Sequence, residues 1–316
     1  MWILFTVVVA VVILLFAIAY HFTNVSYLPK KWALADTYEK AVEKGQIDPQ
    51  VFEAMEKEEI SVPSAYGYDL DGLWMPVEDS NRTAIICHGY TMNKFGSMKY
   101  THVFRRMGFN VLIYDHQFHG KSGGDLCTMG FREKNDLKTM VDWLEKKVGL
   151  GGTLVTHGES MGGGTVLMHA AMDHRVSAVV SDCAFADTKD VFAYRLKADY
   201  GLPAFPLLYM ASFISKLRVG AYYYEISPWS VIDQVTIPVL FINGTADDYV
   251  PMSHTATLFD RKPGVKELHM VEGAGHALAY EADPGAYEAV VEGFLLNHVL
   301  AHGQRDSNVH EGVHGE

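Results

Sequence analysis

The sequence has 316 residues, 49% of them hydrophobic, so the chain is long and apolar enough to bury one large core. Its formal net charge of −12 disfavours nucleic acid as a partner, because the phosphates would be repelled by such a surface. The cysteines, Cys87, Cys127 and Cys183, fit no metal-ligand spacing, and an odd number cannot form a complete set of disulfides. We therefore expect one main domain with buried thiols and without a metal or cofactor.

The chain opens with a strongly apolar stretch. No side chain is charged from Met1 to Tyr20, and this segment is long enough to cross the hydrocarbon core of a membrane. We expect residues 1–22 to form an uncleaved, single-pass anchor in the cell membrane. The partners implied are therefore the membrane and, as argued below, a small-molecule substrate, while the oligomeric state is left open.

A cleaved signal peptide is the alternative interpretation of this stretch. The Ala17-Ile18-Ala19 sequence resembles a processing site, but the positively charged start that is usual in signal peptides is missing. Lys30 and Lys31 follow the apolar stretch and favour a cytoplasmic main domain. Their acidic neighbours weaken this indication, so the side of the membrane stays open.

The next segments connect the anchor to the main domain. Residues 23–58 carry mixed charge and are interrupted by Asp48-Pro49, which predicts a polar amphipathic stalk. Residues 59–77 show β-like runs, and Asp71-Gly72 is typical of a hairpin turn. These signals predict an antiparallel edge at the start of the sheet.

After this edge, apolar strands alternate with helical segments. One such helix is predicted over Phe131–Val148. Continuous apolar strands separated by helices indicate an α/β domain, with a mostly parallel sheet covered by helices on both faces. Ligands of such sheets bind at the carboxyl ends of the strands. The predicted strands are Thr83–Cys87, Asn110–Tyr114, Thr153–His157, Ala178–Cys183, Val239–Asn243 and Lys266–Val271.

The most informative motif is Gly158-Glu159-Ser160-Met161-Gly162, which lies between a predicted strand and a predicted helix. In a G-x-S-x-G turn the serine hydroxyl is lifted above the sheet edge, and the glycines remove the Cβ atoms that would clash there. Ser160 is therefore the predicted nucleophile. The amide of Met161 and the dipole of the following helix would face an oxyanion formed at this point.

A second amide donor is expected from Tyr90. The His88-Gly89 pair follows the strand at Ile85-Ile86, and a sharp turn there would aim the Tyr90 amide at the same point as that of Met161. The predicted oxyanion hole is therefore built by the backbone N–H groups of Tyr90 and Met161. The side chain of His88 is expected only to brace the loop.

The remaining members of a triad follow the last two predicted strands. Asp247 has a suitable position to hold a histidine ring, with the adjacent Asp248 as its rival. His276 lies in a glycine-containing loop after the last strand and is the predicted base. The resulting order Ser, Asp, His is the one expected for an α/β-hydrolase.

With these motifs the chain resembles the α/β-hydrolase family, and within it the membrane-anchored bacterial hydrolases of the Bem46-like and serine-aminopeptidase-like groups. The resemblance covers roughly residues 60–302 and includes Tyr114-Asp115 and His119-Gly120-Lys121-Ser122-Gly123-Gly124. One departure is His116-Gln117, where many relatives carry arginine, which leaves the ion pairing of this loop open. The resemblance implies an α/β-hydrolase catalytic domain over 59–302.

The segment of about 185–234 is expected to form a helical cap that is inserted into the catalytic domain. It is rich in aromatic and aliphatic residues, which suits an apolar lid over the serine. Its cations Arg195, Lys197, Lys216 and Arg218 would meet either solvent or an acidic substrate. Residues 303–316 are polar and are expected to be a disordered tail.

Together these features predict a serine hydrolase that cleaves a moderately hydrophobic carboxylic ester through an acyl-enzyme. A peptidase or amidase with the same triad is the first alternative, although the cap shows no acidic cluster to grip a peptide amine. A non-catalytic binding protein on the same fold is the second alternative. Dehalogenase and epoxide hydrolase chemistry is disfavoured, because those enzymes carry aspartate at the position of Ser160.

Overall fold

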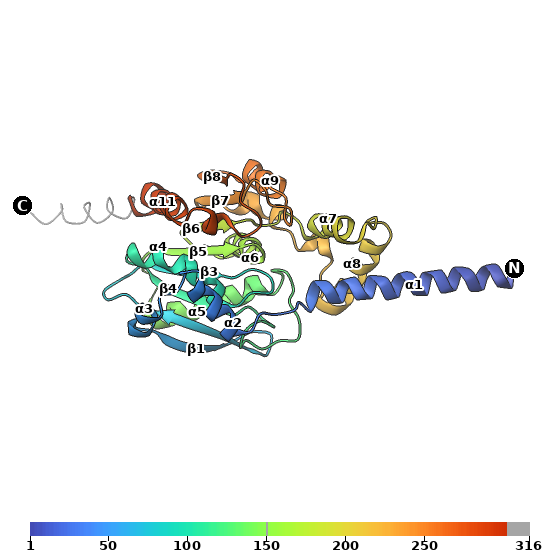
Figure 1. Cartoon of the computed structure of the whole chain (residues 1–316), viewed down its shortest axis with the longest axis horizontal. Helices are drawn as coiled ribbons and strands as arrows, with labels where there is room; N and C mark the ends of the chain where they lie inside the picture. The colour runs from blue at the N-terminus through green and yellow to red at the C-terminus, as the bar shows by residue number, and fades with distance from the viewer. Residues whose placement is uncertain (150, 302–316) are drawn as a thin grey trace, which may run out of the picture.

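The computed structural model describes residues 1–149 and 151–301 and contains an eight-stranded sheet with helices on both faces (Figure 1). The strand order is β1-β2-β4-β3-β5-β6-β7-β8, in which β1, β2 and β4 pair antiparallel and the remaining neighbours pair parallel. The predicted α/β-hydrolase fold class is confirmed. The strands are β1 (Glu58–Pro63), β2 (Asp69–Met75), β3 (Thr83–Cys87), β4 (Asn110–Tyr114), β5 (Leu154–Glu159), β6 (Ala178–Asp182), β7 (Val239–Gly244) and β8 (Lys266–Val271).

The antiparallel edge is present, but its turn is not where the sequence predicted it. Asp71-Gly72 lies in the middle of β2, where Gly72 pairs with Ile60 and Tyr114 on the two neighbouring strands. The β1–β2 turn instead runs from Ser64 to Gly67, whose N–H donates to the Ser64 carbonyl oxygen at 3.2 Å, and Gly67 has a φ of 85°. Gly72 is needed for packing, because a Cβ atom there would lie 3.0 Å from the Ile60 side chain.

The inner strands β3 to β7 are buried on both faces, as a parallel α/β sheet requires, while the edge strands β1 and β8 are partly exposed. In β3 the side chains of Ile85 and Cys87 enter one core cluster, and those of Ala84 and Ile86 enter the other. The helices α5, α6 and α9 pack on the first face, and α2, α4 and α11 pack on the second. The bounds are α2 (Leu34–Glu43), α4 (Thr101–Arg106), α5 (Glu133–Val148), α6 (Met161–Ala170), α9 (Ser253–Arg261) and α11 (Pro284–Leu295).

Helix α5 begins two residues later than the sequence predicted. The carboxylate of Glu133 accepts hydrogen bonds from the backbone N–H groups of Thr128, at 2.7 Å, and Gly130, at 2.9 Å. This fully buried glutamate therefore stabilises a turn in the preceding loop, which keeps residues 131 and 132 out of the regular helix.

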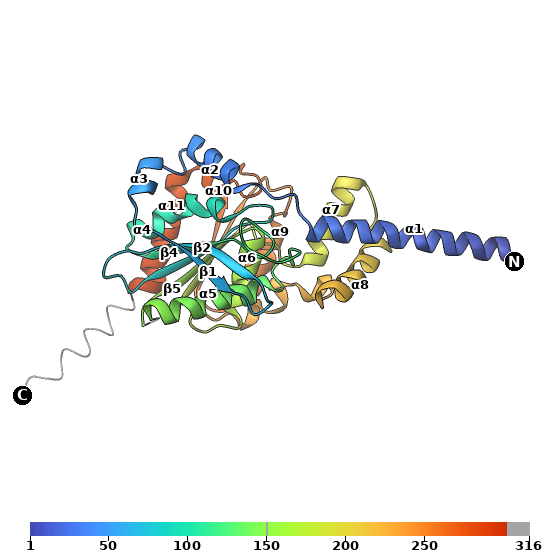
Figure 2. The same ribbon diagram turned by 90° about the horizontal axis from the view of Figure 1, so that it is seen from below.

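A separate layer of helices lies beyond the carboxyl ends of the strands. The segment between β6 and β7 contains α7 (Thr188–Tyr200) and α8 (Leu207–Val219), which together with the C-terminal part of α1 (Trp2–Tyr27) form a third core cluster. The N-terminal part of α1 projects beyond these helices in both views (Figures 1 and 2). We refer to α7, α8 and the short helical turns up to Gln234 as the cap.

Helix α1 is the one helix in the described ranges that is long and apolar enough to cross a membrane. It extends five residues beyond the expected anchor of residues 1–22, because its last turns are held by the cap. The buried hydroxyl of Tyr27 lies 2.5 Å from Ser215 Oγ, and the side chain of Arg218 donates to Asn24 Oδ1 at 2.7 Å.

The segment predicted to be a stalk packs instead against the domain body. Ala41 of α2 and Ile47 are buried in the core cluster on the second face of the sheet, and α3 (Pro49–Ala54) follows directly. The reason is the amphipathic pattern of α2, whose apolar side packs against the 3-10 helix η1 (Lys94–Tyr100) at the edge of this core cluster. The predicted polar tail, residues 303–316, lies outside the described residues.

Candidate active site

The turn around Ser160 has the backbone strain expected for a nucleophile elbow. Ser160 joins β5 to α6 with a φ of 56° and a ψ of −113°, a conformation rare for residues with a Cβ atom. A Cβ atom on Gly158 would lie 2.2 Å from the carbonyl oxygen of Gly162, and one on Gly162 would lie 2.2 Å from that of Cys87. Only glycine fits at either position, so the turn can form only with this sequence pattern.

The structure brings Ser160, His276 and Asp247 into one hydrogen-bonded chain. Ser160 Oγ lies 2.9 Å from His276 Nε2, and His276 Nδ1 lies 2.7 Å from Asp247 Oδ2. Because the carboxylate can only accept, Nδ1 carries the proton and Nε2 is free to accept the serine hydroxyl proton. This is the tautomer that a general base needs in order to activate the serine.

The two adjacent aspartates have different environments. The buried carboxylate of Asp247 also accepts from the backbone N–H groups of Tyr249, at 2.9 Å, and Val250, at 2.8 Å, which fixes its orientation. Asp248 is exposed, and its contact with the cap is made by its carbonyl oxygen, which accepts from Arg195 at 3.0 Å. Asp247 is therefore the carboxylate that contacts the imidazole.

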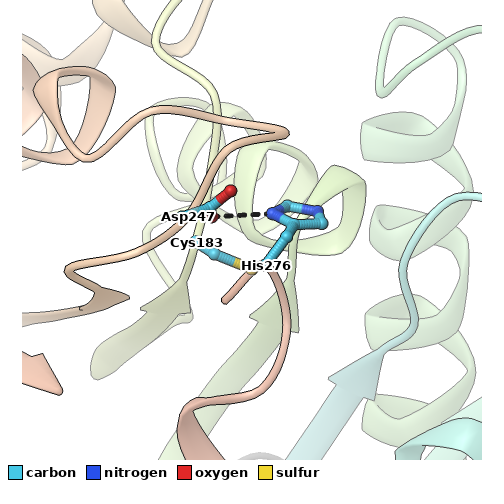
Figure 3. Close-up of side chains that lie close together, drawn as sticks. All are labelled: Cys183, Asp247 and His276. Carbon is cyan, nitrogen blue, oxygen red and sulfur yellow. Dashed lines mark hydrogen bonds and ion pairs between the residues drawn. The ribbon is translucent and has the colours of Figure 1, made fainter. Parts of the chain in front are cut away.

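A thiol also lies close to the histidine and the carboxylate. Figure 3 shows Cys183 beside Asp247 and His276, and one potential ligand atom from each residue lies within 4.8 Å of the others. Complete burial raises the pKa of the Cys183 thiol well above its usual range, so the thiol is protonated at neutral pH. Since metals bind cysteine as the thiolate, this group behaves as a small buried neighbour of the histidine.

The two amides predicted to bind an oxyanion lie next to the serine. Met161 is the first residue of α6, so its N–H has no acceptor within that helix. The Gly89-Tyr90 backbone also runs beside the serine, because a Cβ atom on Gly89 would lie only 3.5 Å from Ser160 Cβ. Both N–H groups are thus carried by backbone segments adjacent to the Ser160 side chain.

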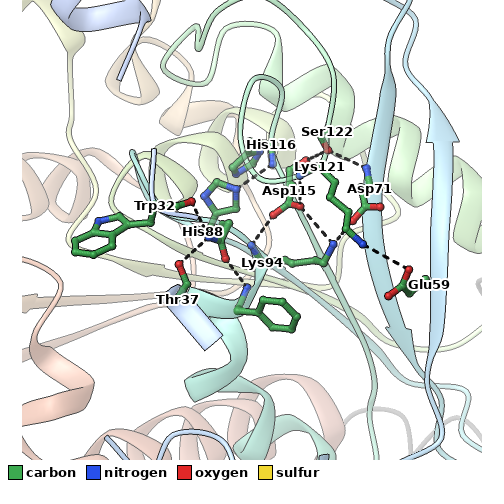
Figure 4. A network of polar contacts seen from close by, with 12 residues as sticks. Trp32, Thr37, Glu59, Asp71, His88, Lys94, Asp115, His116, Lys121 and Ser122 are labelled. Carbon is green, nitrogen blue, oxygen red and sulfur yellow. Dashed lines mark hydrogen bonds and ion pairs between the residues drawn. The ribbon is translucent and has the colours of Figure 1, made fainter. Parts of the chain in front are cut away.

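The loop that carries Tyr90 is braced by the side chain of His88. Its Nδ1 donates to the carbonyl oxygen of Gly89 at 2.8 Å. Its Nε2 accepts from the backbone N–H of His116 at 2.9 Å, as Figure 4 shows. Burial lowers the pKa of His88 to about 4, so the ring is neutral and can make both bonds. This geometry agrees with the bracing function predicted for the side chain.

A buried ion pair lies behind the same loop. The ammonium group of Lys94 lies between the carboxylates of Asp71 and Asp115, and its nitrogen is 3.4 Å from Asp115 Oδ2 (Figure 4). Asp115 also accepts from the backbone N–H groups of Lys94, at 2.7 Å, and Lys121, at 3.0 Å. The cation that the loop lacks at His116-Gln117 is therefore supplied by Lys94, which the sequence pattern did not reveal.

A second group of charged residues lies beneath the serine and was also missed from the sequence. The Lys99 ammonium lies 2.7 Å from Glu159 Oε2, which also accepts from the Tyr100 hydroxyl at 2.5 Å. Burial by itself raises the pKa of Glu159, but Lys99 and Tyr100 bring it below its usual value. Burial and the charge of Glu159 raise the pKa of Asp182 to about 7. The backbone carbonyl of Asp182 accepts from Ser160 N–H at 2.8 Å, so this group supports the turn directly.

On the cap side, an apolar pocket begins next to the histidine. The ring of Tyr249 lies 5.0 Å from that of His276, and the guanidinium of Arg195 lies 4.3 Å above Tyr249. Both residues line a pocket between α1, α7 and α8, and so does Tyr90. The pocket therefore lies next to His276 and to the Tyr90 loop, which is expected to bind the carbonyl oxygen of a substrate.

The family model described as the prolyl oligopeptidase family matches residues 97–302 of the chain. Among curated proteins, the uncharacterised protein YqkD of Bacillus subtilis is 42% identical over 290 residues, which cover 91% of this chain and 95% of YqkD. The bem46 protein of Schizosaccharomyces pombe is 24% identical over 240 residues, which cover 69% of this chain and 74% of that protein.

Solved structures with a similar fold include two esterases. The esterase Pf2001 of Pyrococcus furiosus superposes with a TM-score of 0.66 at 24% identity, covering 80% of this chain and 94% of that one. Est1E of Butyrivibrio proteoclasticus, solved with ferulic acid bound, superposes with a TM-score of 0.62 at 20% identity, covering 76% and 99%. At this level of identity the likeness concerns the fold.

Replacing the buried lysine tests the ion pair behind the Tyr90 loop. Lys94→Met would leave the fully buried carboxylate of Asp115 uncompensated, so we expect a loss of about 3–5 kcal/mol in the free energy of unfolding, measured by urea denaturation. The matched control is Lys121→Met. Lys121 is 55% exposed and pairs with Glu59 at 3.7 Å, so we expect a loss below about 1 kcal/mol. Equal losses in the two variants would contradict this assignment.

The pKa of Asp182 predicts a specific pH dependence of stability. A carboxyl group whose pKa rises on folding stabilises the folded state while it is protonated, and this stabilisation is lost as the pH rises from about 4 towards 7. Asp182→Asn cannot ionise, so its free energy of unfolding should improve relative to wild type between pH 5 and pH 8. Urea denaturation at both pH values measures this difference. The exposed Asp190→Asn variant should show no such change, and a pH-independent difference for Asp182→Asn would refute the prediction.

Proposed function

We propose that this chain, which belongs to the prolyl oligopeptidase family and is a hydrolase of the α/β fold, cleaves carboxylic esters with Ser160 as its nucleophile. The observation that carries the proposal is the continuous hydrogen-bonded chain from Ser160 Oγ through His276 to Asp247. A binding protein without activity would have no need of this chain, of the strained serine or of an amide at the start of α6 that has no acceptor within the helix.

The proposed reaction has two halves. His276 Nε2 takes the proton of the Ser160 hydroxyl as the oxygen attacks the carbonyl carbon of the ester, and the amides of Tyr90 and Met161 receive the negative charge. The imidazolium, balanced by Asp247, then protonates the leaving alcohol, and an acyl-enzyme remains. Water, deprotonated by the same histidine, then attacks the acyl carbon. The bond to Ser160 Oγ breaks, the imidazolium returns its proton to that oxygen, and the carboxylic acid leaves.

The surroundings of the site favour an ester over a peptide. The pocket next to the site is mostly apolar, and the carboxylate of Asp199 in its wall is already paired with Arg195 at 3.1 Å. A peptide amine would need a free carboxylate in that wall. The alternative of a peptidase or amidase is favoured by the name of the matching family alone.

We also propose that α1 is retained as a membrane anchor. Ala19, the residue at which a signal peptidase would cut, is fully buried in the core cluster that α1 shares with the cap. The helix has a mean hydropathy of 3.1 over its most apolar window. Cleavage after Ala19 would remove α1 residues that pack against the cap. The contact between α1 and the cap therefore favours retention of the helix over its removal.

Removing the nucleophile tests the reaction. Ser160→Ala should lower hydrolysis of 4-nitrophenyl acetate by at least about 10⁴-fold and abolish labelling by a fluorophosphonate probe, because the alanine has no group that can attack the carbonyl. The exposed Ser253→Ala at the start of α9 is the matched control and should keep both activities. Undiminished turnover in a folded Ser160→Ala variant, checked by circular dichroism, would exclude the mechanism.

The two adjacent aspartates give a second test. Asp247→Asn should lower kcat/KM by about 10³–10⁴-fold, because an amide at this position no longer favours the tautomer with the proton on Nδ1. Asp248→Asn changes an exposed side chain and is expected to have little effect. Steady-state kinetics with the same ester measure both variants, and the reverse ranking would show that Asp248 is the functional carboxylate.

A further inference from the structure

Helix α1 is divided into a free part and a part held by the cap. Residues 1–14 are exposed throughout, whereas Ala19, Thr23 and Tyr27 are buried at intervals of four residues. The free part projects beyond α7 and α8 in both views (Figures 1 and 2). The cap therefore contacts only the C-terminal half of the helix, and it does so on the face that carries these three residues.

The length of the free part limits where the cap lies relative to a membrane. At 1.5 Å per residue, 14 helical residues extend roughly 21 Å, while the hydrocarbon core of a bilayer is about 30 Å thick. The free part is thus too short to cross the core alone. If α1 spans the bilayer, the part of the cap next to residues 15–20 lies at the level of the lipids.

The outer face of α8 has the composition that such a position requires. Tyr209, Phe213 and Leu217 repeat every four residues and so share one face of the helix, and they are 57%, 46% and 71% exposed. Phe205, just before the helix, is 74% exposed. We call these four residues the α8 stripe. Its residues lie on the opposite side of the helix from Ala211 and Ser215, which contact α1.

The pocket beside the proposed catalytic residues opens between α1 and this same helix. Phe22 and Val25 of α1 line it together with Leu207 and Leu208 of α8. At the side of the site, the hydroxyl of Tyr90 donates to the carbonyl oxygen of Val25 at 2.6 Å. The apolar helix thus forms a wall of the pocket and is bonded to a residue of the predicted oxyanion hole.

We propose that the α8 stripe rests in the bilayer and that the substrate of Ser160 is a lipid-phase ester with a long acyl chain, which enters the pocket between α1 and α8. The occupant of the stripe is the membrane, because the free part of α1 is too short to cross the hydrocarbon core alone and the cap beside it must then lie partly within the bilayer. This inference rests on the proposed function and on the retention of α1. It goes beyond them in assigning the route and the size of the substrate.

The test uses the full chain reconstituted in phosphatidylcholine vesicles, with two esters as probes. 4-Methylumbelliferyl oleate dissolved in the vesicles reports the lipid-phase reaction, and 4-nitrophenyl acetate in water reports the chemistry alone. Phe213→Glu combined with Leu217→Glu should lower the oleate rate by roughly tenfold and leave the acetate rate unchanged, since neither side chain lines the pocket. The matched control is Leu268→Glu on β8, which is 40% exposed and should change neither rate.

A variant of the pocket wall tests the route. Val25 is 46% exposed, so Val25→Trp is tolerated by the fold while its larger side chain narrows the space between α1 and α8. The ratio of kcat/KM for oleate to that for acetate should fall by about tenfold or more. An unchanged ratio would show that long chains reach the serine by another path.

The position of the stripe is tested without any activity. The native cysteines Cys87, Cys127 and Cys183 are buried, so a nitroxide attached to Leu217→Cys reports from one site. In vesicles its collision rate with oxygen should exceed that with a water-soluble nickel complex, and the reverse should hold for Leu268→Cys. A water-exposed label at 217 would overturn the proposal.

The proposed function and the lipid-phase route are contradicted by different results. Absence of acetate hydrolysis in the wild-type protein would refute the proposed function. Acetate hydrolysis together with an oleate rate that is insensitive to the glutamate pair would refute only the lipid-phase route.

Discussion

The site depends on the close approach of two backbone segments at the end of β5. Gly158 lies against Gly162, and Gly162 lies against the carbonyl oxygen of Cys87 on β3, at distances that no side chain permits. This contact forces Ser160 into its left-handed conformation and aligns the start of α6 with the loop that carries Tyr90. A methyl group at either glycine would separate β3 from α6 and so separate the serine from the predicted oxyanion donors.

Buried charged groups on both sides of this turn keep its backbone in place. Behind the Tyr90 loop, Lys94 neutralises Asp115, which in turn binds two backbone amides. Beneath the serine, Lys99 neutralises Glu159, while Asp182 holds the serine N–H through its own backbone. Buried charges of this kind add little net stability compared with apolar packing, but they define one geometry, because any shift leaves a charge without its partner.

The N-terminal helix has an exposed apolar part and a part that is packed into the domain. Its last turns fill the cap, its backbone binds the hydroxyl of Tyr90, and the segment that follows donates from Trp32 N–H to the carbonyl oxygen of Thr91 at 3.0 Å. The loop expected to stabilise an oxyanion is therefore tied to the helix at two points. A change in the position of α1 would act on this loop through hydrogen bonds, without passing through the sheet.

The sequence by itself predicted the six strands after residue 82, the elbow and the three residues Ser160, Asp247 and His276, because these depend on local patterns: apolar runs, paired glycines and loops that follow strands. It did not reveal that Lys94 and Lys99 are buried, or that residues 34–54 pack against the domain body, because the sequence of a lysine or an amphipathic helix is the same whether it faces solvent or a core. The sequence favoured Asp247 over Asp248 by its position alone, and the tertiary structure supplied the physical reason, since the folded loop buries one carboxylate against the imidazole and leaves its neighbour in water. Burial, and with it the partner of each charge, is a property of segments distant in the chain, so it was decided only when they packed together.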